Sequence, residues 1–137
     1  MEKEKKYPKV GVGTIVMKDG KVLLGKRISN HGIGTYSVPG GHLEFFEEFE
    51  DGAARECFEE TGIKVKNLRF EHATNNILEN DGVHSITVFM KGEYAGGEAT
   101  VTEPEKFVEV GWYDPHNLPE PLFLPLKLFL SQGHRLA

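Results

Sequence analysis

Three glutamates within five residues are the part of this sequence best suited to chemistry. Glu56, Glu59 and Glu60 stand at positions i, i+3 and i+4, which share one face of an α-helix. Like charges at this spacing repel one another, and a bound cation would offset the repulsion. An all-oxygen cluster prefers a hard cation such as Mg²⁺ or Mn²⁺. A solvated acidic face is the alternative interpretation, because many surface helices carry the same spacing.

The element that must position these glutamates is a helix predicted over residues 47–61. Apolar residues recur there near helical spacing, and Gly62 suits a C-terminal cap. Upstream, Pro39-Gly40-Gly41 is expected to break a short strand over residues 35–38, and a loop over 41–46 follows. This loop would bring backbone carbonyls and amides to the glutamates.

The remaining pattern predicts one domain over residues 10–137, after a flexible, charged segment over residues 1–9. Asp19-Gly20 between two apolar runs predicts a hairpin turn. A second, apolar helix is expected over residues 121–130, which Pro125 should distort. Strands are predicted over 10–17, 22–27, 66–74, 83–94 and 107–113.

Composition and charge narrow the functional classes. The chain has 137 residues, 39% hydrophobic and 27% charged, as in an ordinary globular domain. A net charge of -5 gives no basic surface for long nucleic acid. No apolar run resembles a signal peptide or membrane span, and a lone Cys57 favours a reducing compartment, so we expect a cytoplasmic protein.

The segment over residues 41–63 resembles the Nudix box, G-x5-E-x7-R-E-U-x-E-E-x-G-U, where U is apolar. Cys57 stands at a position that is usually aliphatic, and we expect its thiol to be buried and inert. Phe46 stands where many relatives have glycine, and it would be strained if that position needs a positive φ. Every fixed position of the box is occupied, by Gly41, Glu47, Arg55, Glu56, Cys57, Glu59, Glu60, Gly62 and Ile63.

This resemblance implies an α/β fold, the Nudix α/β/α sandwich with a mixed β-sheet and a loop-helix catalytic box. Glu56 and Glu60 are the expected principal ligands of Mg²⁺, with Mn²⁺ as a substitute, and Glu59 is a further ligand or a base. The backbone carbonyl of Gly40 or Gly41 is expected to complete the metal's coordination shell.

Two supporting roles follow from the same resemblance. Glu47 and Arg55 are expected to form an ion pair that fixes the loop onto the helix.

The metal would neutralise a diphosphate and lower the pKa of a bound water. The base that takes the water's proton remains open among Glu59, Glu60 and Glu105.

The resemblance extends from Val10 to about Gly133 and is greatest for small MutT-like nucleoside-triphosphate pyrophosphohydrolases that act on oxidised or non-standard purine triphosphates. Arg27 and His42 are the expected phosphate-binding side chains. The base pocket implied by the resemblance consists of Ser37, Val38, Thr87, Phe123 and Leu126.

The expected activity is therefore Mg²⁺-dependent hydrolysis of a nucleoside triphosphate to a monophosphate and pyrophosphate. Hydrolysis of ADP-ribose or another nucleotide sugar is an alternative. A second alternative is a non-catalytic Nudix-fold module that senses nucleotides, although the complete set of box carboxylates argues against it. A homodimer is compatible with the resemblance, and no feature of the sequence itself indicates one.

Overall fold

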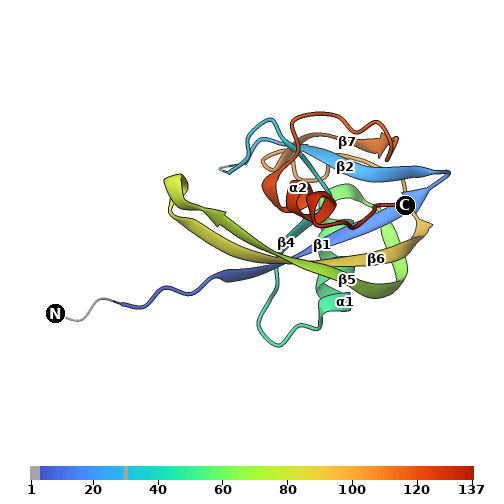
Figure 1. Ribbon diagram of the computed structural model, residues 1–137. Helices are drawn as coiled ribbons and strands as arrows, with labels where there is room; N and C mark the ends of the chain where they lie inside the picture. The colour runs from blue at the N-terminus through green and yellow to red at the C-terminus, as the bar shows by residue number, and fades with distance from the viewer. Residues whose placement is uncertain (1–3, 30) are drawn as a thin grey trace.

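The computed structural model describes residues 4–29 and 31–137 (Figure 1). A seven-stranded mixed sheet has the order β3-β2-β1-β6-β5, with β4 paired to β1 and β7 paired to β2. Strands β1 to β4 are Lys9–Lys18, Lys21–Arg27, Tyr36–Ser37 and Gly40–His42. Strands β5 to β7 are Lys64–Leu78, Val83–Gly96 and Phe107–Tyr113. The helices α1 and α2 are Phe49–Thr61 and Leu124–Ser131, and a 3₁₀ turn covers Glu79–Asp81.

Strand β1 is the centre of the sheet. The predicted hairpin joins it antiparallel to β2, with Asp19 at φ 51° and Gly20 at φ 77°. Positive φ at both central residues is what a tight hairpin turn with an Asp-Gly pair requires. On its other side β1 pairs in parallel with β6 from Lys9 to Met17, which makes the sheet mixed, as predicted.

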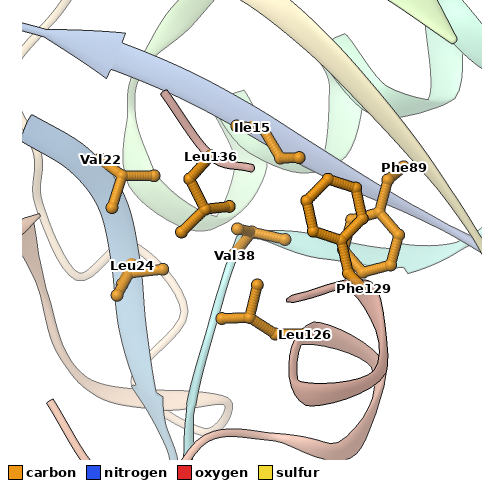
Figure 2. Packing of buried hydrophobic residues seen from close by; sticks show 8 residues of the cluster. All are labelled: Ile15, Val22, Leu24, Val38, Phe89, Leu126, Phe129 and Leu136. Atoms are coloured by element: carbon orange, nitrogen blue, oxygen red, sulfur yellow. The ribbon is translucent and has the colours of Figure 1, made fainter. Parts of the chain in front are cut away.

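The core lies on both faces of the sheet, because neighbouring residues of β1 point to opposite faces. Toward α1, Val12 and Val16 pack in clusters with Ala53 and Cys57 of the helix. Figure 1 shows α1 and α2 on opposite faces of the sheet, so the predicted α/β/α sandwich is confirmed. Figure 2 shows the cluster toward α2, formed by Ile15, Val22, Leu24, Val38, Phe89, Leu126, Phe129 and Leu136.

Two element predictions are wrong. The predicted break and loop after residue 39 contain the strand β4, which pairs with β1 in the register Gly13↔Gly40. A Cβ atom on Gly40 would stand 2.1 Å from the carbonyl oxygen of Val12, so only glycine permits this approach. Helix α2 begins at Leu124 rather than at residue 121. Pro125 therefore lies in its first turn, where no amide hydrogen is needed, and causes no distortion.

The flexible N-terminal segment stays a prediction, because β1 begins at Lys9 and residues 1–3 lie outside the described residues. Among the residues that the structure describes, no helix is long and apolar enough to cross a membrane.

Candidate active site

Helix α1 carries the three predicted carboxylates on the side that faces β4. Glu56 and Glu60 are buried, with 5% and 1% of their surface exposed, whereas the Glu59 side chain is half-exposed. The helix ends directly after them at Gly62, whose φ of 75° suits the expected glycine cap. The glutamate spacing thus places the carboxylates of Glu56 and Glu60 against β4 and that of Glu59 at the exposed rim of the site.

Glu60 is tied to the backbone of the glycine segment. The amide nitrogen of Gly40 donates a hydrogen bond of 2.7 Å to Glu60 Oε1. Burial raises the pKa of Glu60 to about 8, against the opposing effect of this hydrogen bond, and the neighbouring charge of Glu56 adds to the rise. A buried carboxylate of this kind is stabilised by a nearby cation.

Glu56 has one oxygen paired and one free. Arg55 Nη1 donates to Glu56 Oε1 at 2.8 Å, whereas Oε2 is buried without a partner among the described residues. A Cβ atom on Gly41 would lie 2.5 Å from this Oε2, so the bare backbone of β4 lies directly against the carboxylate. A buried, unpaired carboxylate oxygen is unfavourable unless a cation or a water binds it.

The carbonyl of Gly40 is free of the β1 ladder. Hydrogen bonds from Thr14 N to Pro39 O and from Leu43 N to Val10 O, at 2.9 and 3.0 Å, mark the bonded pairs of β1 and β4. Gly40 lies opposite Gly13, between two such pairs, in a non-bonded position. Its amide and carbonyl therefore both point away from β1, to the side on which the amide bonds Glu60.

Arg55 connects the loop, the helix and β4. Its guanidinium donates to Glu47 in a bidentate pair of 2.8 and 3.0 Å, to Glu59 at 3.2 Å and to the carbonyl of His42 at 3.2 Å. The hydrogen bond from Arg55, with a second from the Glu44 amide, lowers the pKa of Glu47 to about 2. Glu47 therefore remains ionised, and the loop stays attached to the helix.

Phe46 adopts the left-handed conformation, with φ 66°. The residue is 94% exposed, and its ring contacts the neighbouring Phe45 ring, with 4.3 Å between centroids. The loop thus needs the backbone angle that glycine adopts freely, and Phe46 gains little burial in return.

Lys106 and Glu103 also belong to this site, although sequence reasoning gave them no role. Lys106 Nζ lies 3.7 Å from Glu60 Oε2 and 3.6 Å from Glu103 Oε1. Glu105, a candidate base from the sequence, is exposed. Lys106 and Glu103 belong to no motif with the box. The pairing of β7 with β2 and backbone contacts of the preceding segment, such as Ile28 N to Lys106 O and Thr100 N to Thr61 O, bring them there.

A cavity of about 970 Å³ extends from β4 over the α2 side of the sheet. Gly40 and Gly41 line the end nearest the carboxylates, and Phe89 lines the apolar end. All the side chains predicted to bind substrate line it, namely Arg27, His42, Ser37, Val38, Thr87, Phe123 and Leu126.

Arg27 presents a desolvated positive charge to this cavity. Its guanidinium stacks on the Phe123 ring at 3.9 Å and donates to His31 O and Ser29 Oγ, each at 3.1 Å. Burial lowers the pKa of Arg27, and the charge of Glu60 opposes this effect. No carboxylate within the described residues forms an ion pair with Arg27, so an anionic ligand can bind there.

The donor set fits a hard divalent cation. The Glu56 Oε2 oxygen, the Glu60 carboxylate and the Gly40 carbonyl are all oxygen donors, as Mg²⁺ prefers. Across residues 4–29 and 31–137, no three acidic, histidine or cysteine side chains form a metal-binding group by themselves. Glu59 turns to Arg55 instead. Mg²⁺ needs no more than one or two carboxylates, because waters and substrate phosphates supply its other ligands.

Comparison with known proteins identifies the family. The NUDIX domain model matches residues 7–132. An ADP-ribose pyrophosphatase of Methanocaldococcus jannaschii is 34% identical over 119 residues, 85% of this chain and 68% of that protein. The NAD-capped RNA hydrolase NudC of Escherichia coli strain SMS-3-5 is also 34% identical over 119 residues, but this chain covers only 44% of its length.

A solved structure gives the same result over nearly the whole chain. The crystal structure of a MutT NUDIX hydrolase from Burkholderia pseudomallei matches with a TM-score of 0.86 and 29% identity, covering 93% of this chain and 99% of that one. Together with the box geometry, these matches show that the chain belongs to the Nudix family, as a MutT-like Nudix hydrolase.

Proposed function

We propose that this hydrolase converts nucleoside triphosphates, oxidised or non-standard purine triphosphates in particular, to monophosphates and pyrophosphate with the help of Mg²⁺. One observation carries the proposal: a single cavity joins the glycine backbone beside Glu56 and Glu60 to an apolar compartment, with Arg27 along its wall. This order suits a ligand with a planar base at one end and a phosphate chain at the other.

Mg²⁺ would be held by Glu56, Glu60 and the Gly40 carbonyl. When bound, it supplies charge neutralisation of the diphosphate oxygens and lowers the pKa of a water. Arg27 and His42 would bind and orient the phosphates from the cavity side. Glu59, half-exposed at the rim, is the remaining carboxylate of this face that can accept the proton of the attacking water.

ADP-ribose is the second candidate substrate. The Methanocaldococcus jannaschii relative, at 34% identity over 85% of this chain, carries the name of an ADP-ribose pyrophosphatase. A cavity of about 970 Å³ is at the upper end of the usual range for small-molecule sites, and it has room for the second ribose. A non-catalytic sensing role is disfavoured, because the relatives described above are named as hydrolases and the box carboxylates are complete.

A substrate screen tests the proposal. The purified chain is incubated with Mg²⁺ and 8-oxo-dGTP, the ordinary dNTPs, dihydroneopterin triphosphate or ADP-ribose, and products are separated by chromatography. We expect a purine triphosphate to give monophosphate and pyrophosphate fastest, and EDTA to abolish turnover. Faster release of AMP from ADP-ribose would favour the second candidate. No hydrolysis of any diphosphate compound would contradict both.

The expected homodimer also remains a prediction. Light scattering on the eluate of a size-exclusion column measures the mass directly, and a value near the 15.3 kDa of one chain would contradict it.

A further inference from the structure

Lys106 brings a positive charge to the buried Glu60 carboxylate. Its Nζ lies 3.7 Å from Glu60 Oε2, whereas the Gly40 amide donates to Oε1. Glu60 is 1% exposed and Glu56 is its neighbour on the same helix face, so two buried negative charges lie close together. Buried like charges are unfavourable unless a cation offsets them. In the free protein, Lys106 is a cation that does so for Glu60.

The position of Lys106 is set by the backbone around it. Its amide donates to Glu103 O at 2.9 Å, which closes a turn, and its carbonyl accepts from Ile28 N at 2.9 Å. Phe107, the next residue, is 2% exposed and begins β7. A fixed backbone and a buried neighbouring ring therefore keep the lysine next to Glu60.

Glu103 flanks the same ammonium group. The turn brings the two side chains together, with Glu103 Oε1 at 3.6 Å from Lys106 Nζ. That oxygen is buried without a hydrogen-bond partner among the described residues. Loss of the lysine charge would therefore leave the carboxylates of Glu60 and Glu103 near each other with no cation between them.

The two buried carboxylates of the site thus have different counter-cations. Arg55 donates to Glu56 at 2.8 Å and is itself held by a bidentate pair with Glu47. The Lys106 ammonium lies 3.6 and 3.7 Å from its two carboxylates, which is too long for a hydrogen bond. Its effect on Glu60 is therefore electrostatic, and a cation that binds Glu60 more closely can take its place.

A divalent cation held by Glu60 must share that carboxylate with Lys106. The two positive charges repel each other, so the lysine lowers the affinity of the free protein for the metal. It also keeps the metal-free site from carrying uncompensated buried charge. One lysine can in this way stabilise the empty site and leave the metal exchangeable.

We propose that Lys106 is a positioning residue that serves as the counter-cation of Glu60 in the metal-free protein and competes with Mg²⁺ for this carboxylate. The inference rests on the proposed function, in which Glu56 and Glu60 hold the metal. Two effects of opposite sign follow from it. Loss of the lysine charge should destabilise the metal-free protein and tighten its binding of Mg²⁺.

The test measures metal binding without substrate. Calorimetric titration with MgCl₂ gives the Kd, and thermal unfolding in EDTA gives the stability of the metal-free protein. Measurements are made at pH 9, above the pKa of Glu60, which burial raises to about 8. In Lys106→Gln we expect the Kd for Mg²⁺ to fall at least about fivefold, and the unfolding temperature in EDTA to fall by about 3 °C.

Two controls separate charge from shape and from net charge. Lys106→Arg keeps the positive charge and should retain the wild-type Kd and unfolding temperature. Lys127→Gln makes the same change in net charge at an exposed lysine of α2, and it should also behave as the wild type.

Glu103→Gln tests whether Lys106 lies electrostatically between the two carboxylates. In Lys106→Gln, Glu103 and Glu60 repel each other, so adding Glu103→Gln should raise the unfolding temperature in EDTA by about 2 °C. In the wild type the same change removes a favourable partner of Lys106 and should not raise it. Equal effects in both backgrounds would contradict the proposed arrangement of charges.

The double variant also replaces Lys106→Gln if that variant does not fold, and it should bind Mg²⁺ at least about fivefold more tightly than Glu103→Gln alone. A folded Lys106→Gln with the wild-type Kd overturns the proposal, and so does a failure of both proteins to bind Mg²⁺. If no diphosphate compound is hydrolysed but Lys106→Gln binds Mg²⁺ more tightly, the counter-cation role holds and the proposed reaction fails. Hydrolysis with an unchanged Kd in the variant shows the reverse.

Discussion

The carboxylate face of α1 and the hydroxyl wall of the cavity are built in contrasting ways. The first is charged and comes from one helix and its preceding loop. Arg55 orients it through hydrogen bonds to four different residues. The second is neutral and comes from β3, β5 and β6, as Ser37, Asn76, Ser85 and Thr87. Asn76 orients it by donating to the hydroxyls of Ser85 and Thr87. The contrast suggests a division of labour, in which the first region performs the reaction and the second selects the base.

The largest expected effect comes from Glu60→Gln. This change keeps the size of the side chain and an oxygen that can accept from Gly40, but removes the charge that would bind the metal. We expect kcat to fall at least about 100-fold for 8-oxo-dGTP and dGTP alike, with little change in unfolding temperature. Steady-state kinetics and calorimetric melting measure both quantities.

The control for this change is Glu50→Gln, at an exposed glutamate in the first turn of the same helix. It should leave both rates unaltered. Wild-type rates in Glu60→Gln would remove its proposed metal role. If Glu60→Gln lowered the rate for one nucleotide but not for the other, the proposed division between the two regions would be wrong.

A smaller effect is expected from Arg55→Lys. An ammonium group cannot span Glu47, Glu56 and the His42 carbonyl at once, so the loop loses its attachment while the charge remains. We expect a loss of about 2 kcal/mol in the free energy of unfolding and about tenfold in kcat/KM for both nucleotides. Denaturant titration and kinetics measure these losses.

Arg69→Lys is the matched control, because the Arg69 side chain is 65% exposed and pairs only with Glu71 among the described residues. Its free energy of unfolding should change by less than about 0.5 kcal/mol. Equal effects of the two changes would show that Arg55 is an ordinary surface arginine.

The two regions also differ in how far the sequence could predict them. The spacing of Glu56, Glu59 and Glu60 is local, so helical periodicity alone places them on one face. The role of Asn76 depends on the pairing of β5 with β6, which shifts register between Lys64 and Val65, Lys66 and Arg69, and Phe70 and His72. Each shift changes which residues face the cavity, so simple alternation could not identify Asn76.

Other differences between sequence and structure have the same origin. Gly40–His42 has no strand signal of its own and becomes β4 only because glycines allow it to approach β1. Lys106 contacts Glu60 from the residue just before β7, far away in the sequence. Arg27 and the apolar wall were predicted by family resemblance, since their types and spacing alone also fit surface and core roles.

Phe46→Gly tests the loop without touching either the carboxylates or the cavity wall. Glycine adopts φ 66° without steric strain, and the exposed Phe46 ring contributes little burial. We expect the free energy of unfolding to rise by about 1 kcal/mol, with the ratio of the rates for 8-oxo-dGTP and dGTP unchanged. Phe45→Gly, at the neighbouring exposed ring without a positive φ, should instead lower stability slightly. A destabilised Phe46→Gly would indicate that the ring has a partner in solution.

The smallest effect is expected at Cys57, which is fully buried between α1 and the sheet. Its reactivity therefore tests whether this interior is closed to solvent while the cavity is open. Burial raises the pKa of its thiol to about 12, so at pH 8 only about one molecule in ten thousand carries the reactive thiolate. Iodoacetamide should therefore leave the native chain unmodified by mass spectrometry. In Thr87→Cys the new thiol should react and be protected by dGMP, while Cys57 stays intact. Alkylation of native Cys57 at a comparable rate would show that the interior behind α1 opens as readily as the cavity.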